Sequence, residues 1–574
     1  MRQYLMCVHA TLCFAVWCGC SGSEPATSTT ESGNAKSEPH PAVSQPETSG
    51  PGAGAIRQAR VPDDSVNHSS DGSTTTPRQF PSFPNAAPQQ PQWVSANTPF
   101  DVVAYFQIPE AKDNAEPIYL DALFEFSSDM SVCFGPLDSE LPRLVRFRAD
   151  EADKRSQRLD HFSELWGRSR SSVDAKSVDA WLAEYEVGFE NLTRAQQRSQ
   201  CVFQVGSDLV ALMPHLSAAR QVAYIVEWRT RRDVAQGKLD RPIQDVALLL
   251  RLSRDVRHRS GELGQLVSVA IDKMVYSEIV AKILRSDSIT TGHCSRLLSV
   301  LQRHATSPKQ RAADAIRGEY VVTRQTFHDL QHRTGTFTTQ ALNDLFERQA
   351  GQVDRSLHIL SCLALLRDMD SFSSRLAEAK YGNVSGVAGG QQVLPFDWKF
   401  DGKLLSDAEY SQEVAVINRV YAAILSALDA MLPSMPPNEA LQTWVAPLAD
   451  TRLALFFEPR GWDGMISRIL KSETQRRGTL CLIALRRWLC EHDAPPATLR
   501  VAVQSAGMSD VPIDTFTESA MRMTTIGGHP IIYSVGPDGR DDGGQVEWDE
   551  HTQSSKGDLL FRLHPEKPKS DAVP

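Results

Sequence analysis

Residues 216–256 read LSAARQVAYIVEWRTRRDVAQGKLDRPIQDVALLLRLSRDV, and this stretch decides the fold. Apolar residues recur on one face at helical spacing in both halves, which predicts two amphipathic helices. Gly237 lies in the joint between them, Pro242 falls in the first turn of the second helix, and Asp240 is available as its cap. We therefore expect an antiparallel αα-hairpin.

The helical pattern continues on both sides of this hairpin, from about residue 98 to residue 495. No strand-like alternation of any length interrupts it, and no fixed repeat period can be aligned. The expected fold class is mainly α, with an irregular or solenoid-like helical body over residues 98–466. The predicted helices are Ala115–Phe126, Leu216–Val234, Pro242–Val256, a long segment after Gly261, Ala312–His332, Thr339–Asp370, Asp407–Met431 and Ser467–Glu491.

The first twenty residues indicate export. Arg2 is followed by Leu5–Gly19, LMCVHATLCFAVWCG, whose length suits a signal peptide and is short of the roughly 20 residues that span a bilayer. A Cys after a small residue at the end of such a run resembles the lipobox of bacterial lipoproteins, which implies that Cys20 is lipidated and becomes the mature N-terminus. We expect residues 1–20 to be this signal; a plain cleaved signal and an uncleaved anchor are the alternatives.

Residues 21–97 have the composition of a disordered tether. Small and polar residues dominate up to Gln90, and the aromatic residues there are Phe80 and Phe83. Such a segment buries too little apolar surface to offset the entropy of ordering its backbone. We expect it to act as a spacer between the membrane and the folded body.

Charge and length exclude some classes of protein. A chain of 574 residues is long enough for several domains, and its net charge is −10 at pH 7. An acidic chain lacks the basic field that supplies most non-specific affinity for DNA or RNA. We therefore expect no nucleic-acid partner.

The ten cysteines do not form a dense disulfide framework. Four lie in the signal segment, and the others are scattered through helical sequence without a CxxC motif. Cys481 and Cys490 share one predicted helix, about 13 Å apart along its axis, and cannot bridge each other there. We expect mostly buried free thiols and at most one long-range disulfide among Cys133, Cys201, Cys294, Cys362, Cys481 and Cys490.

One motif suggests zinc chemistry. Residues 328–332 read HDLQH, which places His328 and His332 at i and i+4 on one helical face beside Asp329. This is the HExxH geometry with an Asp that is one methylene shorter than the usual general base. The downstream Glu347 and His358 have no motif around them that marks a third ligand. We interpret the pair as two solvated histidines; the alternative is a degenerate zinc site.

Residues 467–566 are expected to combine the last helix with a small β-hairpin, followed by a tail over residues 567–574. A short apolar strand around Ile531–Tyr533 runs into a Gly/Pro turn, and Lys556–Leu563 is a plausible second strand. Carboxylates gather between the two strands. Calcium takes six to eight hard oxygen ligands, and glycine-rich loops bend to present them.

The segment YSVGPDG at residues 533–539, followed by DDGG and a later GDL, resembles the C-terminal calcium loop of type II secretion major pseudopilins. The resemblance implies a pseudopilin-like α+β end. It also implies calcium as a cofactor, with side-chain ligands at Asp538, Asp541, Asp542 and Asp558 and carbonyl donors at Ser534 and Val535. Zinc is not the expected metal.

A wider set of segments, Asp113–Ala115 with Tyr119, Phe396–Trp398, Pro512–Asp514 and the closing SVGPDGRDDGG, resembles uncharacterised planctomycete-type envelope proteins. This resemblance implies a helical body with a pseudopilin-like end and no known activity. We therefore predict a non-enzymatic scaffold of the bacterial cell envelope that is tethered through Cys20 and binds protein partners. The alternative is a zinc-dependent hydrolase built on the HDLQH motif.

Overall fold

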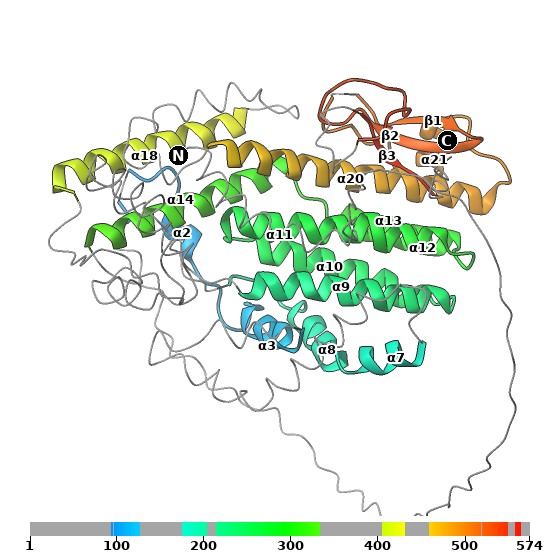
Figure 1. Ribbon diagram of the computed structural model, residues 1–574, viewed down its shortest axis with the longest axis horizontal. Helices are drawn as coiled ribbons and strands as arrows, with labels where there is room; N and C mark the ends of the chain where they lie inside the picture. The colour runs from blue at the N-terminus through cyan, green and yellow to red at the C-terminus, as the bar shows by residue number, and fades with distance from the viewer. Residues whose placement is uncertain are drawn as a thin grey trace, which may run out of the picture. The chain divides into compact units, whose positions relative to one another are not determined.

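The computed structural model describes residues 93–95, 97–126, 175–203, 214–332, 405–430, 459–517, 519–548 and 557–563. This part of the chain is mainly helical and ends in one small antiparallel sheet, so the prediction of a mainly α fold is confirmed (Figure 1). In order the elements are α2 Val102–Phe106, α3 Glu116–Phe126, α7 Ala175–Ala183, α8 Glu186–Ala195, α9 Pro214–Ala235, α10 Asp240–Arg257, α11 Gly261–Lys273, the π-helix η1 Met274–Val280, α12 Ala281–Arg285, α13 Thr291–Arg303, α14 Pro308–His332, α18 Asp407–Ala430, α20 Pro459–Glu491, α21 Leu499–Ser505, β1 Arg522–Ile526, β2 His529–Ser534 and β3 Leu559–Phe561.

Helices α9 and α10 form the predicted hairpin. Gly237 has a φ of 71°, a left-handed conformation that lets the chain reverse at little cost. The predicted role of Asp240 was wrong. It is the first residue of α10, the preceding Leu239 makes no side-chain cap, and the Asp240 carboxylate instead pairs with Arg296 of α13. The hairpin is thus joined to a later helix at the point where a cap was expected.

The long segment after Gly261 forms a continuous helical stretch made of α11, η1 and α12. Its central seven residues are π-helical, which the apolar periodicity did not predict. Helix α20 also differs from expectation, because it begins at Pro459 rather than at Ser467. No helix in the described ranges is both long and apolar enough to cross a membrane.

Helix α20 contributes to two separate hydrophobic clusters. Its first half places Met465, Ile466, Ile469 and Leu470 in a cluster with α2, α14 and α18. Its second half places residues 480–485 in a larger cluster with α3, α7–α13, α21 and the sheet. Figure 1 shows α20 running from the α14–α18 pair to the sheet. One continuous helix therefore belongs to both cores.

The sheet has the order β1-β2-β3 and is antiparallel throughout. Strand β2 pairs with β3 through Tyr533 opposite Leu560, so the predicted pairing of these two segments is confirmed. Strand β1 was missed. It pairs with β2 across Gly527 and Gly528, two glycines with positive φ that form the tight turn.

The folded part begins earlier than predicted. Trp93, placed in the expected tether, is 6% exposed, and its indole N–H donates to Oε1 of Gln325 at 2.8 Å. Its ring also packs edge-on against Tyr320, with centroids 5.9 Å apart. The apolar indole makes this short segment part of the second cluster, so the prediction of disorder up to residue 97 was wrong at its end.

Several predictions lie outside the described residues. They are the signal segment with Cys20, the tether up to residue 92, the helix over residues 339–370, Glu347, His358, Cys133, Cys362 and the tail over residues 567–574. The four cysteines within the described ranges have free thiols; Cys201, Cys294 and Cys481 are buried, as expected, and Cys490 is exposed.

Candidate functional site

The C-terminal loop between β2 and β3 brings the four predicted carboxylates to one place. Asp558, directly before β3, is fully buried and accepts the backbone N–H of Gly544 at 2.7 Å. Asp538 accepts the N–H of Gly557, next to Asp558, at 3.2 Å. Gly544 has a φ of 74°, which favours glycine and turns its N–H toward Asp558. The loop is thus closed by side chain to backbone hydrogen bonds.

One of these carboxylates, Asp541, is also engaged with other groups. Asp541 forms an ion pair with Arg522 of β1 and accepts the N–H of Gly543 at 3.0 Å. Burial raises the pKa of Asp558, and the negative charges of Asp541 and Asp542 raise it further. A cation would relieve this repulsion, but Arg522 already supplies one.

Within the described residues no group of three or more His, Cys, Asp or Glu side chains is placed to hold a metal ion. Ser534 and Val535, the predicted carbonyl donors, lie beside Asp514. The carboxylate of Asp514 accepts the Ser534 hydroxyl at 2.8 Å and the Val535 N–H at 3.0 Å. Asp541, one of the predicted calcium ligands, is thus paired with Arg522 in this arrangement.

The HDLQH motif lies at the C-terminal end of α14. The imidazole rings of His328 and His332 have centroids 4.5 Å apart, as the i, i+4 spacing predicts. His328 is only 9% exposed, so its interpretation as a solvated residue was wrong. Asp329 accepts two hydrogen bonds of 2.9 Å from the amide of Gln325. The carboxylate is thus held by another side chain of its own helix.

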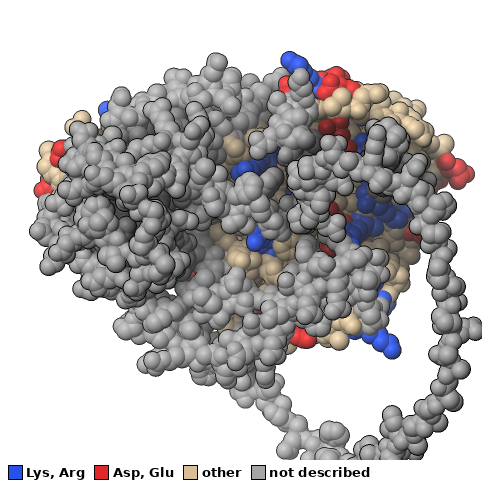
Figure 2. All heavy atoms as spheres, viewed as in Figure 1, with Lys and Arg blue, Asp and Glu red and all other residues tan. Residues whose placement is uncertain are grey.

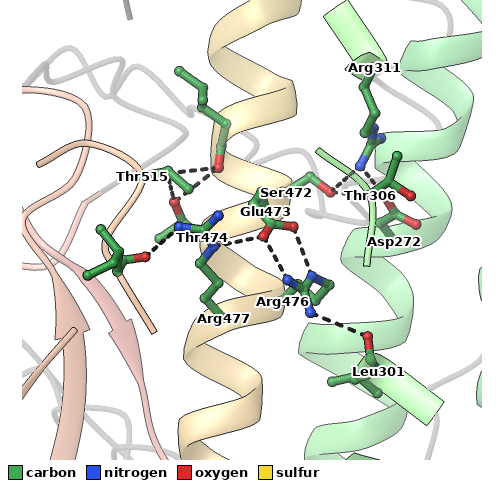
Figure 3. Close-up of polar contacts among 12 residues, drawn as sticks. Asp272, Leu301, Thr306, Arg311, Ser472, Glu473, Thr474, Arg476, Arg477 and Thr515 are labelled. Carbon is green, nitrogen blue, oxygen red and sulfur yellow. Dashed lines mark hydrogen bonds and ion pairs between the residues drawn. The ribbon is translucent and has the colours of Figure 1, made fainter. Parts of the chain in front are cut away.

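A buried polar network joins four helices, and sequence reasoning missed it. Arg311 of α14 donates to Asp272 of α11 at 2.9 Å, to Ser472 of α20 at 3.3 Å and to Ser268 of α11 at 3.2 Å. Ser253 of α10 donates to Asp272 at 2.6 Å, and Ser472 donates to it at 3.0 Å. All five residues are at most 5% exposed. Figure 3 shows Arg311 between Ser472 and Asp272.

The network continues along α20 through a second carboxylate. Glu473, 4% exposed, accepts hydrogen bonds from Arg476 at 2.7 and 2.8 Å and from Arg477 at 2.7 Å (Figure 3). Arg476 also donates to the carbonyl oxygen of Leu301 at the end of α13, at 3.3 Å. Arg477 donates to the carbonyl oxygen of Ile513 before the sheet, at 2.7 Å. Glu473 therefore positions two arginines that hold different neighbours of α20.

The chemistry of this network is structural. A serine nucleophile needs a neighbouring base that takes its proton, commonly an imidazole. Here the Asp272 carboxylate is neutralised by Arg311 and accepts two serine hydroxyls, while both partners are shielded from water. Burial of an ion pair is costly unless hydrogen bonds satisfy both partners, and the serines supply them. The network stabilises the register of α10, α11, α14 and α20.

Sequence signals for this network exist but are weak. Ser268 and Asp272 lie four residues apart within the buried face of α11, between Val267 and Val275. Polar residues inside an apolar stripe indicate a buried hydrogen-bond partner.

Comparisons with family models, with curated proteins and with solved structures found no match to this chain.

Proposed function

We propose that this chain is an exported, membrane-tethered, non-enzymatic scaffold of the bacterial cell envelope. The observation that carries the proposal is the single helix α20, which belongs to both hydrophobic clusters and also contacts the sheet. Its side chains hold neighbouring elements: Ser472 accepts from Arg311 of α14, Arg476 donates to Leu301 of α13, and Arg477 donates to Ile513 before the sheet. Such a body keeps a fixed shape while the N-terminal segment, whose sequence has an export signal and a spacer, ties it to the membrane.

Charge supports protein partners in the envelope. The chain has a net charge of −10, and both acidic and basic side chains of described residues are visible on the face seen in Figure 2. Mixed charges of this kind suit protein surfaces better than polyanions, which need a continuous basic field. We assign the binding of a protein partner to the C-terminal sheet and its acidic loop.

The tether is tested by changing Cys20. In cells that process bacterial lipoproteins, we expect Cys20→Ser to abolish incorporation of labelled fatty acid and to move the protein from the membrane to the soluble fraction, because its lipid anchor is lost. Cys18→Ser is the matched control, since it alters a cysteine of the same segment. Membrane association of the Cys20→Ser protein equal to that of Cys18→Ser would contradict the lipid anchor.

The proposal includes calcium stabilisation of the C-terminal loop, supported by the gathering of four carboxylates. We expect calcium to raise the melting temperature of the purified full chain relative to chelator. We expect a larger rise in Arg522→Gln, because Asp541 then has no competing cation. Equal melting temperatures with calcium and with chelator in both proteins would contradict calcium binding.

The same preparation tests the alternative, a zinc-dependent hydrolase. The observation that favours this alternative is the proximity of the His328 and His332 rings. Elemental analysis after dialysis gives the metal content directly. Stoichiometric zinc that is lost in His332→Ala would replace the scaffold proposal with the hydrolase, whereas a scaffold keeps its fold and binds no stoichiometric zinc in either protein.

A further inference from the structure

Two cysteines from distant parts of the chain meet where α13 packs on α20. Cys294 lies in the first turns of α13 and is fully buried. Cys490 is the penultimate residue of α20 and is exposed. Cys490 lies close enough to Cys294 to contribute to the raised pKa of the Cys294 thiol. They are separated by 196 residues of sequence, so only the packing of these helices brings them together.

Contacts near both ends of α13 show how this helix packs on α20. Near the end of α13, Leu301 accepts a hydrogen bond from Arg476; before its start, Ser286 accepts one from Arg486, each at 3.3 Å. The two helices therefore run antiparallel. The Sγ of Cys490 lies 3.9 Å from the carbonyl oxygen of Ile289, which precedes the cap of α13. Helical side chains tilt toward the N-terminus of their helix, so the thiol of Cys294 is directed back toward this same point.

We propose that Cys294 and Cys490 form a disulfide bond that fastens the C-terminal end of α20 to α13. The place where it would form in the cell rests on the proposed export, because disulfides persist in oxidising compartments outside the cytosol. The reaction itself needs only the arrangement of the two thiols and an oxidant. The other two described cysteines, Cys201 and Cys481, are buried and serve as internal controls.

The exposed thiol reacts first. Burial raises the pKa of Cys294 to about 12, and the neighbouring Cys490 contributes. The thiolate of Cys490 attacks one sulfur of a small-molecule disulfide, forms a mixed disulfide and releases one thiolate. The sulfur of Cys294 then attacks the sulfur of Cys490 and expels the second thiolate. The protein loses two electrons and two protons, and the oxidant is reduced to two thiols.

Oxidised glutathione is the probe. We expect the purified full chain, equilibrated with glutathione, quenched by alkylation and digested, to yield one main cross-linked peptide pair that contains Cys294 and Cys490. The intact protein loses about 2 Da without retaining glutathione. Its melting temperature rises by roughly 5 °C, because the bond closes a long loop of the unfolded chain, and dithiothreitol reverses the rise.

Three variants make the assignment specific. Cys490→Ser should lose both the cross-link and the rise in melting temperature. Cys294→Ser should keep glutathione on Cys490 without any rise, and Cys481→Ser should behave as the unchanged chain does. The proposal is overturned if Cys490 of the unchanged chain retains glutathione or pairs with a different cysteine. Because the reaction is run on purified protein, its failure leaves the result for Cys20 unaffected.

Discussion

Replacing Arg311 with Met is expected to lower the free energy of unfolding by about 3–5 kcal/mol, because it leaves the buried carboxylate of Asp272 without a counter-charge. Met fills a similar volume, so the loss is mainly electrostatic and includes the hydrogen bonds to Ser268 and Ser472. Denaturant unfolding followed by circular dichroism at pH 7 measures the change.

Arg317 provides the matched control on the same helix. It pairs with Asp314 at 3.0 Å, but both side chains are about one-third exposed, so Arg317→Met should cost about 1 kcal/mol or less. The double variant Arg311→Met/Asp272→Leu should recover part of the loss, because no charge is then buried alone. Equal stability of Arg311→Met and Arg317→Met would show that the buried pair does not hold these helices.

The position of the network explains why it matters for a scaffold. On α20 the apolar residues of one cluster end at Leu470 and those of the other begin at Leu480, and buried Ser472, Glu473 and Thr474 lie between them. Apolar contacts are not directional, so two cores alone would define the register of α20 poorly. Charged and hydroxyl groups with specific partners define it, since a shift leaves each of them unsatisfied.

Local patterns predicted several of the helices because the causes of those helices are local. The apolar stripes of α9, α10, α14 and α18 each lie within one segment, and so does the Gly237 turn. The start of α20 was predicted late because Gly461 and Gly464 weaken helix propensity in its first turns. Strand β1 was missed because it carries two threonines in place of a strong apolar alternation, although the Gly-Gly turn after it is itself a hairpin signal.

The candidate site was predicted only in part for a similar reason. The four carboxylates lie within 21 residues, and the sequence showed their clustering directly. Their partner Arg522 belongs to the missed strand, so its competition with calcium could not be foreseen. The buried network joins residues from 253 to 472, and such contacts depend on how helices pack rather than on the periodicity of any one of them.

The C-terminal sheet also depends on one buried carboxylate, as the four-helix network depends on Asp272. Asp514, 2% exposed, accepts three hydrogen bonds: from the hydroxyl of Ser534 and from the backbone N–H groups of Val535 and Phe516. Asp514→Ala would leave the Ser534 hydroxyl and the Val535 N–H buried without their acceptor. We expect it to lower the free energy of unfolding of the sheet by about 3 kcal/mol and to speed hydrogen exchange in β2.

Asp510 is the matched control for this prediction. It also accepts a nearby N–H, from Val511 at 2.8 Å, and it pairs with Arg500 at 3.3 Å, but both charged side chains are more than 60% exposed. Water replaces these contacts when Asp510 is changed to Ala, so hydrogen exchange in β2 should stay as it is in the unchanged chain. If Asp514→Ala and Asp510→Ala exchange alike in β2 while α9 and α10 stay protected in both, the sheet is held by its apolar contact with α20 alone.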